Sequence, residues 1–220
     1  MFMVLDLKRG IAIALAAALA VILVSCTMFR SGDLHTRISR EFSEIESFSA
    51  VIEVAVSSEA GENIYRSRQQ YLTTEAGAML REDVLAPENL AGMTYIFAGG
   101  TMLIIPPNDV NGDGVTFEDI PEARSYTFLP EFFRRYFASE VVATAEMPDA
   151  AAEDAVVVLE ISLDGGNAYR TAQKLWLDHR TLAPLRLETF DETGAALVTV
   201  TFVEFEMNAD IDNEIFDLQR

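Results

Sequence analysis

The chain has 220 residues, half of them hydrophobic, and a formal net charge of −19 at neutral pH. This length suffices for one domain with a sizeable core. The acidic balance argues against binding nucleic acid and against lying flat on an anionic bilayer, because both partners require a basic face.

The N-terminus has the pattern of a secretory signal. Lys8 and Arg9 precede an unbroken apolar run over residues 11–24, and this order of charge and then apolar run is typical of signal peptides. Fourteen helical residues rise only about 21 Å, which is short of the ~30 Å hydrocarbon core of a bilayer. A cleaved signal is therefore favoured over a transmembrane helix.

The only cysteine, Cys26, follows Leu23-Val24-Ser25 at the end of this run. The pattern matches the lipobox of bacterial lipoproteins, in which diacylglycerol is attached to the thiol and cleavage leaves the cysteine first. It predicts a signal peptide over 1–25, a lipidated tether over 26–33 and one domain over 34–220. Two or three acyl chains give stable anchoring, so the expected location is the extracytoplasmic face of the cell membrane. The alternative is a free or buried cysteine after an uncleaved signal anchor.

A helix is the first element expected after the tether. Leu34, Ile38, Phe42 and Ile45 recur at helical spacing, and Asp33 is placed as the N-cap. The pattern predicts a single amphipathic helix.

From Phe48 onward the apolar period changes to two, which is typical of half-buried strands. The pair Gly99–Gly100 is a strong signal for a two-residue hairpin turn. The predicted strands lie in two sets on either side of a helix, at 47–57, 63–74, 78–85, 93–98 and 101–106, then at 140–147, 155–163, 169–177, 184–190 and 195–205. About ten short strands at hairpin spacing predict an α+β, mainly β, fold built on a curved antiparallel sheet or partial barrel.

The helix between the two strand sets is rich in aromatic residues. Pro130 suits its first turn, and it carries Phe132, Phe133, Tyr136 and Phe137. These rings either pack into the core against the concave side of the sheet or form a lid over an apolar cavity. Residues i and i+4 stack, so a lid would anchor one of the pairs 132/136 and 133/137 in the sheet and line the cavity with the other.

Motifs of catalysis are absent from the sequence, and we expect no enzymatic activity. One stretch resembles a calcium loop, with Asp109, Asn111, Asp113 and Gly114 at its first, third, fifth and sixth positions and Asp119 near its end. Ile120 occupies the last position, where a bidentate Glu is required. Calcium binding is expected to be weak at best, and a plain Asp/Asn/Gly-rich surface loop is the alternative.

The order of lipobox, short helix, strands, aromatic helix and strands resembles the LolA/LolB-like lipoprotein-carrier superfamily. Within it, the chain is most similar to the germination (GerS-like) lipoproteins of spore-forming bacteria. The resemblance lies in PENLAGMTYIFAGGTMLIIPP, LPEFFRRYF, GGNAYRTAQKLWLDHRTLAPLRLETFDETG and FVEFEMNADIDNEIFDL.

This resemblance implies an open antiparallel half-barrel around helices, with an apolar hollow that receives acyl chains in the carriers. The implied hollow and lid residues here are Ile52, Val54, Phe97, Leu103, Phe132, Phe133, Tyr136, Phe137 and Trp176.

Two functions follow as hypotheses. In the first, a membrane-anchored lipoprotein holds a lipid or a lipoprotein acyl chain in the half-barrel. In the second, an interaction lipoprotein of the germination type binds an envelope protein without binding lipid. Neither involves nucleic acid or a cofactor other than weakly bound calcium.

Replacement of the thiol tests the anchor. Cys26→Ser is expected to abolish membrane association and to leave unprocessed precursor, as judged by fractionation and intact mass. Cleavage of the Ser variant at the same site, with the product still extracted only by detergent, would contradict the lipoprotein hypothesis.

Overall fold

The computed structural model describes residues 34–75, 77–109, 114–119, 127–138, 155–163 and 170–218. The chain divides into two compact units, Met1–Glu41 and Phe42–Arg220. In the first unit the described residues form a helix that ends at residue 42, where the second unit begins. Ile38 is buried and Arg40 exposed, which confirms the predicted amphipathic pattern, whereas the predicted N-cap Asp33 lies outside the described residues.

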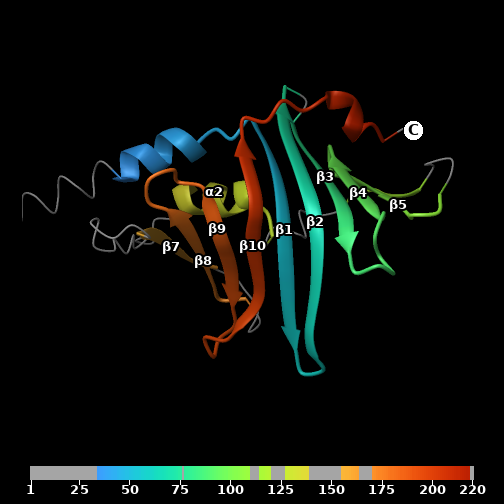
Figure 1. Cartoon of the computed structure of the whole chain (residues 1–220). Helices are drawn as coiled ribbons and strands as arrows, with labels where there is room; N and C mark the ends of the chain where they lie inside the picture. Colours follow the sequence, from blue (N-terminus) through green and yellow to red (C-terminus); the bar gives the residue numbers. More distant parts are fainter. Residues whose placement is uncertain are drawn as a thin grey trace, which may run out of the picture. The chain divides into compact units, whose positions relative to one another are not determined.

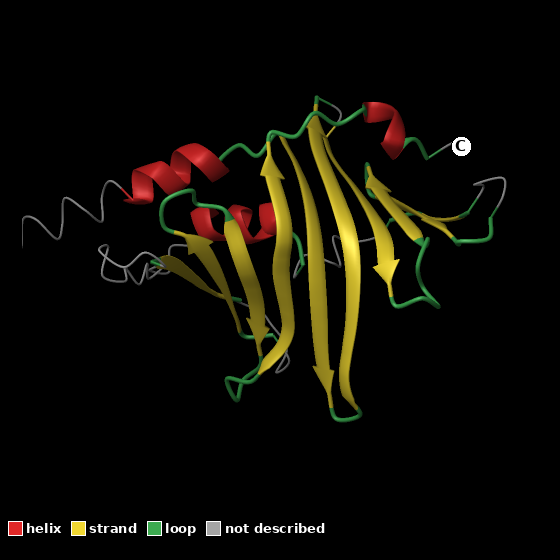
Figure 2. Cartoon of the chain, viewed as in Figure 1, coloured by secondary structure: helices red, strands yellow, loops and turns green. Residues whose placement is uncertain are grey.

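The second unit is built on one antiparallel sheet of ten described strands in the order β6-β5-β4-β3-β2-β1-β10-β9-β8-β7 (Figures 1 and 2). The sheet is curved and unclosed, with β6 and β7 at its two edges, and this confirms the predicted fold class. Its strands are β1 Ser47–Ser58, β2 Gly61–Thr74, β3 Gly77–Ala86, β4 Thr94–Ala98, β5 Thr101–Ile105, β6 Val115–Phe117, β7 Val156–Ser162, β8 Ala172–Asp178, β9 Pro184–Phe190 and β10 Ala196–Met207.

Two helical segments accompany the sheet, α2 (Leu129–Ala138) and the 3₁₀ helix η1 (Asn213–Phe216). α2 contacts β7, and η1 contacts β3 and β4. Within the described ranges, no helix combines the length and the apolar character that crossing a membrane requires.

The core lies on the face of the sheet that α2 covers. Cross-strand pairing aligns Val54, Val200, Leu187, Leu175 and Leu159, and each of these side chains is fully buried. Burial of one such side chain stabilises a fold by about 1.5–3 kcal/mol. This core row therefore fixes β1 and β7–β10 as one half of the sheet.

The opposite face is covered at β4 and β5 by the C-terminal segment. Ile96 and Leu103, which pair across these strands, form a buried cluster with Phe216 of η1. Successive strand residues point to opposite faces, so Phe97 and Met102 lie on the α2 face. Both faces of this half of the sheet thus carry apolar side chains.

The connections follow the predicted turn chemistry. Gly99 and Gly100 have φ values of 57° and 80° and join β4 to β5, as a primed two-residue turn requires. Asp178 Oδ1 accepts hydrogen bonds from the backbone N–H groups of Arg180 and Thr181 in the β8–β9 turn. Short polar side chains of this kind stabilise turns by bonding to their own backbone.

One predicted strand is not tested by the structure, and one described strand was not predicted. The strand predicted at 140–147 lies outside the described residues. The three-residue strand β6, which pairs with β5, was not predicted because it follows the Asp/Asn/Gly-rich loop directly and is too short to show a period.

Gly114 sets the close approach of β6 to β5. Its φ is 58°, and a Cβ atom there would lie 2.6 Å from the carbonyl oxygen of Ile104. Gly99 has nearly the same φ, 57°, but a Cβ atom there would meet nothing within 4 Å. An alanine would therefore have a strained backbone at either position, but its Cβ atom would clash with Ile104 only at position 114.

We predict that Gly114→Ala lowers the free energy of unfolding more than Gly99→Ala does. The strain of a left-handed non-glycine residue costs about 1–2 kcal/mol at either position, and the clash adds to this cost only at 114. Urea unfolding measures both variants. An equal loss of unfolding free energy in the two variants would contradict the prediction, because it would show that β6 can move away from β5 without destabilising the fold.

Candidate ligand-binding cavity

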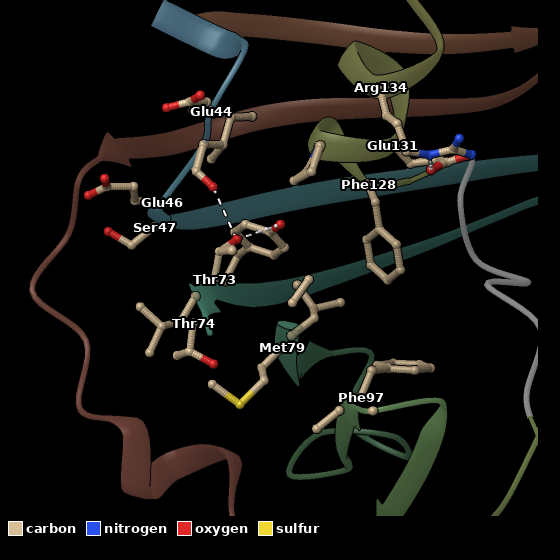
Figure 3. A pocket seen from close by; sticks show the side chains of 18 of the residues that line it. Glu44, Glu46, Ser47, Thr73, Thr74, Met79, Phe97, Phe128, Glu131 and Arg134 are labelled. Atoms are coloured by element: carbon tan, nitrogen blue, oxygen red, sulfur yellow. Dashed lines mark hydrogen bonds and ion pairs between the residues drawn. The ribbon is translucent and has the colours of Figure 1, made fainter. Parts of the chain in front are cut away.

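A cavity of about 1250 Å³ opens at one end of the sheet, between the strand ends and α2 (Figure 3). It is lined by residues 42–47 ahead of and at the start of β1, 71–75 at the end of β2, 78–80 at the start of β3 and 97–101 at the β4–β5 turn. Phe128 and one side of α2 complete the wall. All of these segments belong to the second unit.

An apolar row across four strands runs from the core into the cavity, which three of its four residues line. Phe48, Tyr71, Leu80 and Phe97 are consecutive cross-strand partners in β1–β4. Phe48 is fully buried and stacks on Tyr71, with the ring centroids 5.3 Å apart. Tyr71 and Phe97 are only half-buried, so the row becomes accessible where it enters the cavity.

A hydrogen-bonded contact fixes the wall opposite α2. The Thr73 hydroxyl donates to the carbonyl oxygen of Ile45 at 3.2 Å, and its oxygen lies 2.9 Å from the hydroxyl of Tyr71. The Thr73 N–H also donates to the carbonyl oxygen of Glu46 at 2.7 Å. These bonds hold the segment before β1 against the end of β2.

On α2, Glu131 forms an ion-paired cluster with two arginines. Its Oε1 accepts from Arg134 Nη2 and from Arg135 Nε, each at 2.6 Å. Burial alone would raise the pKa of Glu131, but the hydrogen bonds and positive charges of Arg134 and Arg135 outweigh it and lower the pKa from its ordinary value of 4.5. Glu131 is thus held as a carboxylate at neutral pH.

The four helix aromatics divide three to one by burial. Phe132, Phe133 and Tyr136 are at most 5% exposed, whereas Phe137 is 37% exposed and lines the cavity. Phe133 also stacks on Phe42 with the ring centroids 4.0 Å apart. The division into the pairs 132/136 and 133/137 that helix geometry suggested does not occur, because Phe42 covers Phe133.

The strand residues predicted for the hollow also divide. Phe97 lines the cavity, while Ile52 and Val54 are fully buried on the same face of the sheet. Leu103 lies on the other face, in the cluster with η1. Trp176 lies on that face too, opposite to its neighbour Leu175, and Arg186 stacks over its ring at 4.1 Å. Leu103 and Trp176 must therefore be removed from the set of lining residues.

Several lining residues were missed by the sequence reasoning. They include Phe42, Ile45, Tyr71, Leu80 and Phe128. No short turn fixes the place of Leu80 opposite Phe97, because β3 and β4 are joined by the longer segment 87–93.

The predicted calcium loop is only partly described. Asp109 Oδ2 accepts a hydrogen bond from the Gly114 N–H at 2.8 Å, which closes a turn. Asp119 is exposed, and Asn111 and Asp113 lie outside the described residues, as does the predicted lipidation site Cys26. The described part of the chain contains no group of three or more acidic, histidine or cysteine side chains placed to hold a metal ion. Weak calcium binding stays a prediction.

One protein-family model matches the sequence of this chain. The model of the family described as "Sporulation protein YdcC-like" matches residues 8–216. A search of curated proteins gives no match.

Solved structures with a similar fold come from several bacteria. A putative outer membrane lipoprotein-sorting protein domain from Vibrio parahaemolyticus is 13% identical over 86% of this chain and 97% of its own, with a TM-score of 0.46. A structure of the CwlD amidase from Clostridioides difficile in complex with the GerS lipoprotein matches at 20% identity over 80% of this chain and 95% of the matched chain, with a TM-score of 0.46. The LolA superfamily protein NE2245 from Nitrosomonas europaea is 13% identical over 83% and 96%, with a TM-score of 0.39. A LolA superfamily protein and a complex of a germination lipoprotein are thus among the solved structures to which the chain is similar.

The ion-paired cluster on α2 predicts a pH dependence. Because the folded-state pKa of Glu131 is lowered, its contribution to stability is complete above about pH 4.5 and is lost as the pH falls through the lowered value. Glu131→Gln is therefore expected to reduce the free energy of unfolding at pH 7 and to have a smaller effect at pH 3. Urea unfolding of both proteins at the two pH values measures this. An effect of equal size at both would exclude the ion pairs as its cause.

Proposed function

The chain belongs to the family of YdcC-like sporulation proteins, and we propose that it is a membrane-tethered envelope lipoprotein that holds an acyl chain in the cavity beside α2. The observation that carries the proposal is the apolar row from Phe48 to Phe97, which runs from the filled core into the cavity.

The size and the lining of the cavity suit such a ligand. Sites for drug-sized ligands occupy about 300–1,000 Å³, so a cavity of about 1250 Å³ has room for a longer apolar molecule. An acyl chain needs no hydrogen-bond partner and gains about 0.8 kcal/mol for each buried CH₂ group. The half-buried rings of Tyr71, Phe97 and Phe137 offer the apolar contact.

A binding role is also favoured over an enzymatic one. The described residues that line the cavity include no histidine or cysteine. Glu131, which could serve as a proton acceptor, is occupied by two arginines that lower its pKa. A general base requires a pKa close to the working pH instead. We therefore propose that the ligand is held and released unchanged.

The tether supports the same role. Lipid on Cys26 would keep the domain beside the membrane in which acyl chains are found, at the end of an eight-residue spacer over 26–33.

A second candidate function is binding of an envelope protein at the edge of the sheet. At β6, Val115 is 54% and Phe117 is 42% exposed, and β6 pairs with one strand only among the described residues. An exposed apolar edge can accept an extended segment of a partner as an added strand.

Native mass spectrometry of protein purified from membranes separates the two candidates. Persistent adducts of lipid mass support the cavity proposal, and a lipid-free protein that binds an envelope protein supports the second.

Alanine variants of two neighbouring aromatics test the cavity directly. Phe137→Ala is expected to weaken binding of an uncharged fluorescent acyl ester about tenfold, because a lost ring contact is worth about 1–1.5 kcal/mol, and to change stability little. Phe133→Ala should instead lower the free energy of unfolding by about 3–5 kcal/mol.

The matched control is Phe117→Ala, whose ring has similar exposure but does not line the cavity. Fluorescence titration and urea unfolding measure all three variants and the wild type. Absence of ester binding to the wild type, or equal loss in Phe117→Ala and Phe137→Ala, would refute the proposed site.

A further inference from the structure

The chain after β10 runs along the face of the sheet opposite to α2 and covers β4 and β5 there. We call residues 208–218 the C-terminal strap. Its 3₁₀ helix η1 contacts β3 and β4 and buries Phe216 against Ile96 and Leu103. The strap residues that pack around this cluster are Ile211, Ile215 and Leu218. The strap is thus a short apolar cover on this face.

Two side chains of the sheet form hydrogen bonds to the strap. The Ser47 hydroxyl donates to the carbonyl oxygen of Ala209 at 2.9 Å, and Arg81 Nη1 donates to that of Ile215 at 3.2 Å. Residues 210–218 belong to no strand, so no ladder of backbone hydrogen bonds joins them to the sheet. Segments attached in this way open at a lower free energy than core strands do. The strap can therefore detach while the sheet stays folded.

The strap and the cavity share part of one wall. Leu72 and Met79, which pair across β2 and β3, both line the cavity. The same two side chains pack against the cluster around Phe216. In Figure 3 the side chain of Met79 points toward η1 and away from α2. Ser47, which binds the start of the strap, lines the cavity as well. This wall therefore has the cavity on one side and the strap on the other.

Detachment of the strap would leave this wall without support. Protein interiors are close-packed, so side chains that lose their neighbours on one side lose those contacts outright. Leu72 and Met79 are only half-buried even with the strap in place, and an unbranched methionine side chain adapts its shape readily when it is not packed. A loosened wall makes weaker contact with an apolar chain in the cavity.

We propose that docking of the C-terminal strap controls release of the ligand. While the strap is docked, Leu72 and Met79 are held as a wall and the ligand is retained. When the strap detaches, the wall loosens and the ligand leaves. This inference rests on the proposed function, because it assumes that the cavity holds an acyl chain. Coupling between two sites is reciprocal, so a bound acyl chain must also stabilise the docked strap.

Alanine variants of the strap test the coupling, because neither Ile215 nor Phe216 lines the cavity. Stopped-flow measurement follows dissociation of the uncharged fluorescent acyl ester from the full chain. Release is expected to be about fivefold faster in Phe216→Ala, at the lower end of the coupling typical of linked sites, with a smaller increase in Ile215→Ala. Ile215 is half-buried, so the milder variant keeps the test decisive if loss of the Phe216 ring unfolds the chain.

Val56→Ala is the matched control. Val56 is half-buried like Ile215 and does not line the cavity. It lies near the other end of β1 from Ser47, about 30 Å away at the rise of a β-strand. Release from this variant is expected at the wild-type rate. Urea unfolding of every variant shows whether a change in release merely follows a loss of stability.

Hydrogen exchange of the wild type gives the reciprocal measurement. Saturating ester is expected to slow exchange of the backbone amides of the strap about fivefold, because the same coupling acts in both directions.

Three outcomes overturn the inference and leave the proposed function standing. They are release at the wild-type rate from both strap variants, an equal increase in Val56→Ala and Ile215→Ala, and strap exchange that the ester does not change. Failure of the ester to bind to the wild type refutes the proposed function and the inference together.

Discussion

The register of β1–β4 is the constraint on which the cavity depends. It aligns Phe48, Tyr71, Leu80 and Phe97 as one row on the α2 face. A slip of one residue would turn every side chain of a strand to the other face. The same register places Leu72 and Met79 on the opposite face, where they pack with the cluster around Phe216. In this half of the sheet, one face thus carries the row and the other packs against η1. A slip in register would expose the side chains that pack against η1, and this keeps the row on the α2 face.

The length of α2 explains why the space beside it is not filled like the core. Its ten residues rise about 15 Å, whereas ten strands spaced at about 4.8 Å extend over roughly 43 Å. The helix therefore covers only part of its face. The core row from Val54 to Leu159 is completely buried, while in the row from Phe48 to Phe97 the buried Phe48 and Leu80 alternate with the half-buried Tyr71 and Phe97. The cavity lies along one side of the helix, and its lining extends from Phe128, just before the helix begins, to Phe137 in the last turn.

Much of the fold could be predicted from the sequence, because most strands carry a clear period of two and end at glycine- or aspartate-rich turns. The face to which a side chain points was predictable only where one face is polar. In β4 and β5 both faces carry apolar residues, so the pattern does not distinguish Phe97, which lines the cavity, from Leu103, which packs beneath η1. The run Leu175-Trp176-Leu177 is ambiguous for the same reason, and a register shift follows Trp176. Burial by a distant segment cannot be inferred from periodicity within one strand.

The burial of individual carboxylates could not be predicted either, since composition suggests that most of them are solvated strand side chains. Glu82 is instead 3% exposed on the α2 face and accepts a hydrogen bond from Ser67 at 2.8 Å, while Glu131 is buried between two arginines. A buried carboxylate must be hydrogen-bonded or ion-paired, because its desolvation is costly, and both residues meet this requirement. Glu44, Glu46 and Glu75 remain in solvent and need no partner. The carboxylates thus form two groups. A few are buried and have hydrogen-bond or ion-pair partners, and many are exposed to solvent. Net charge alone could not predict which carboxylates belong to which group.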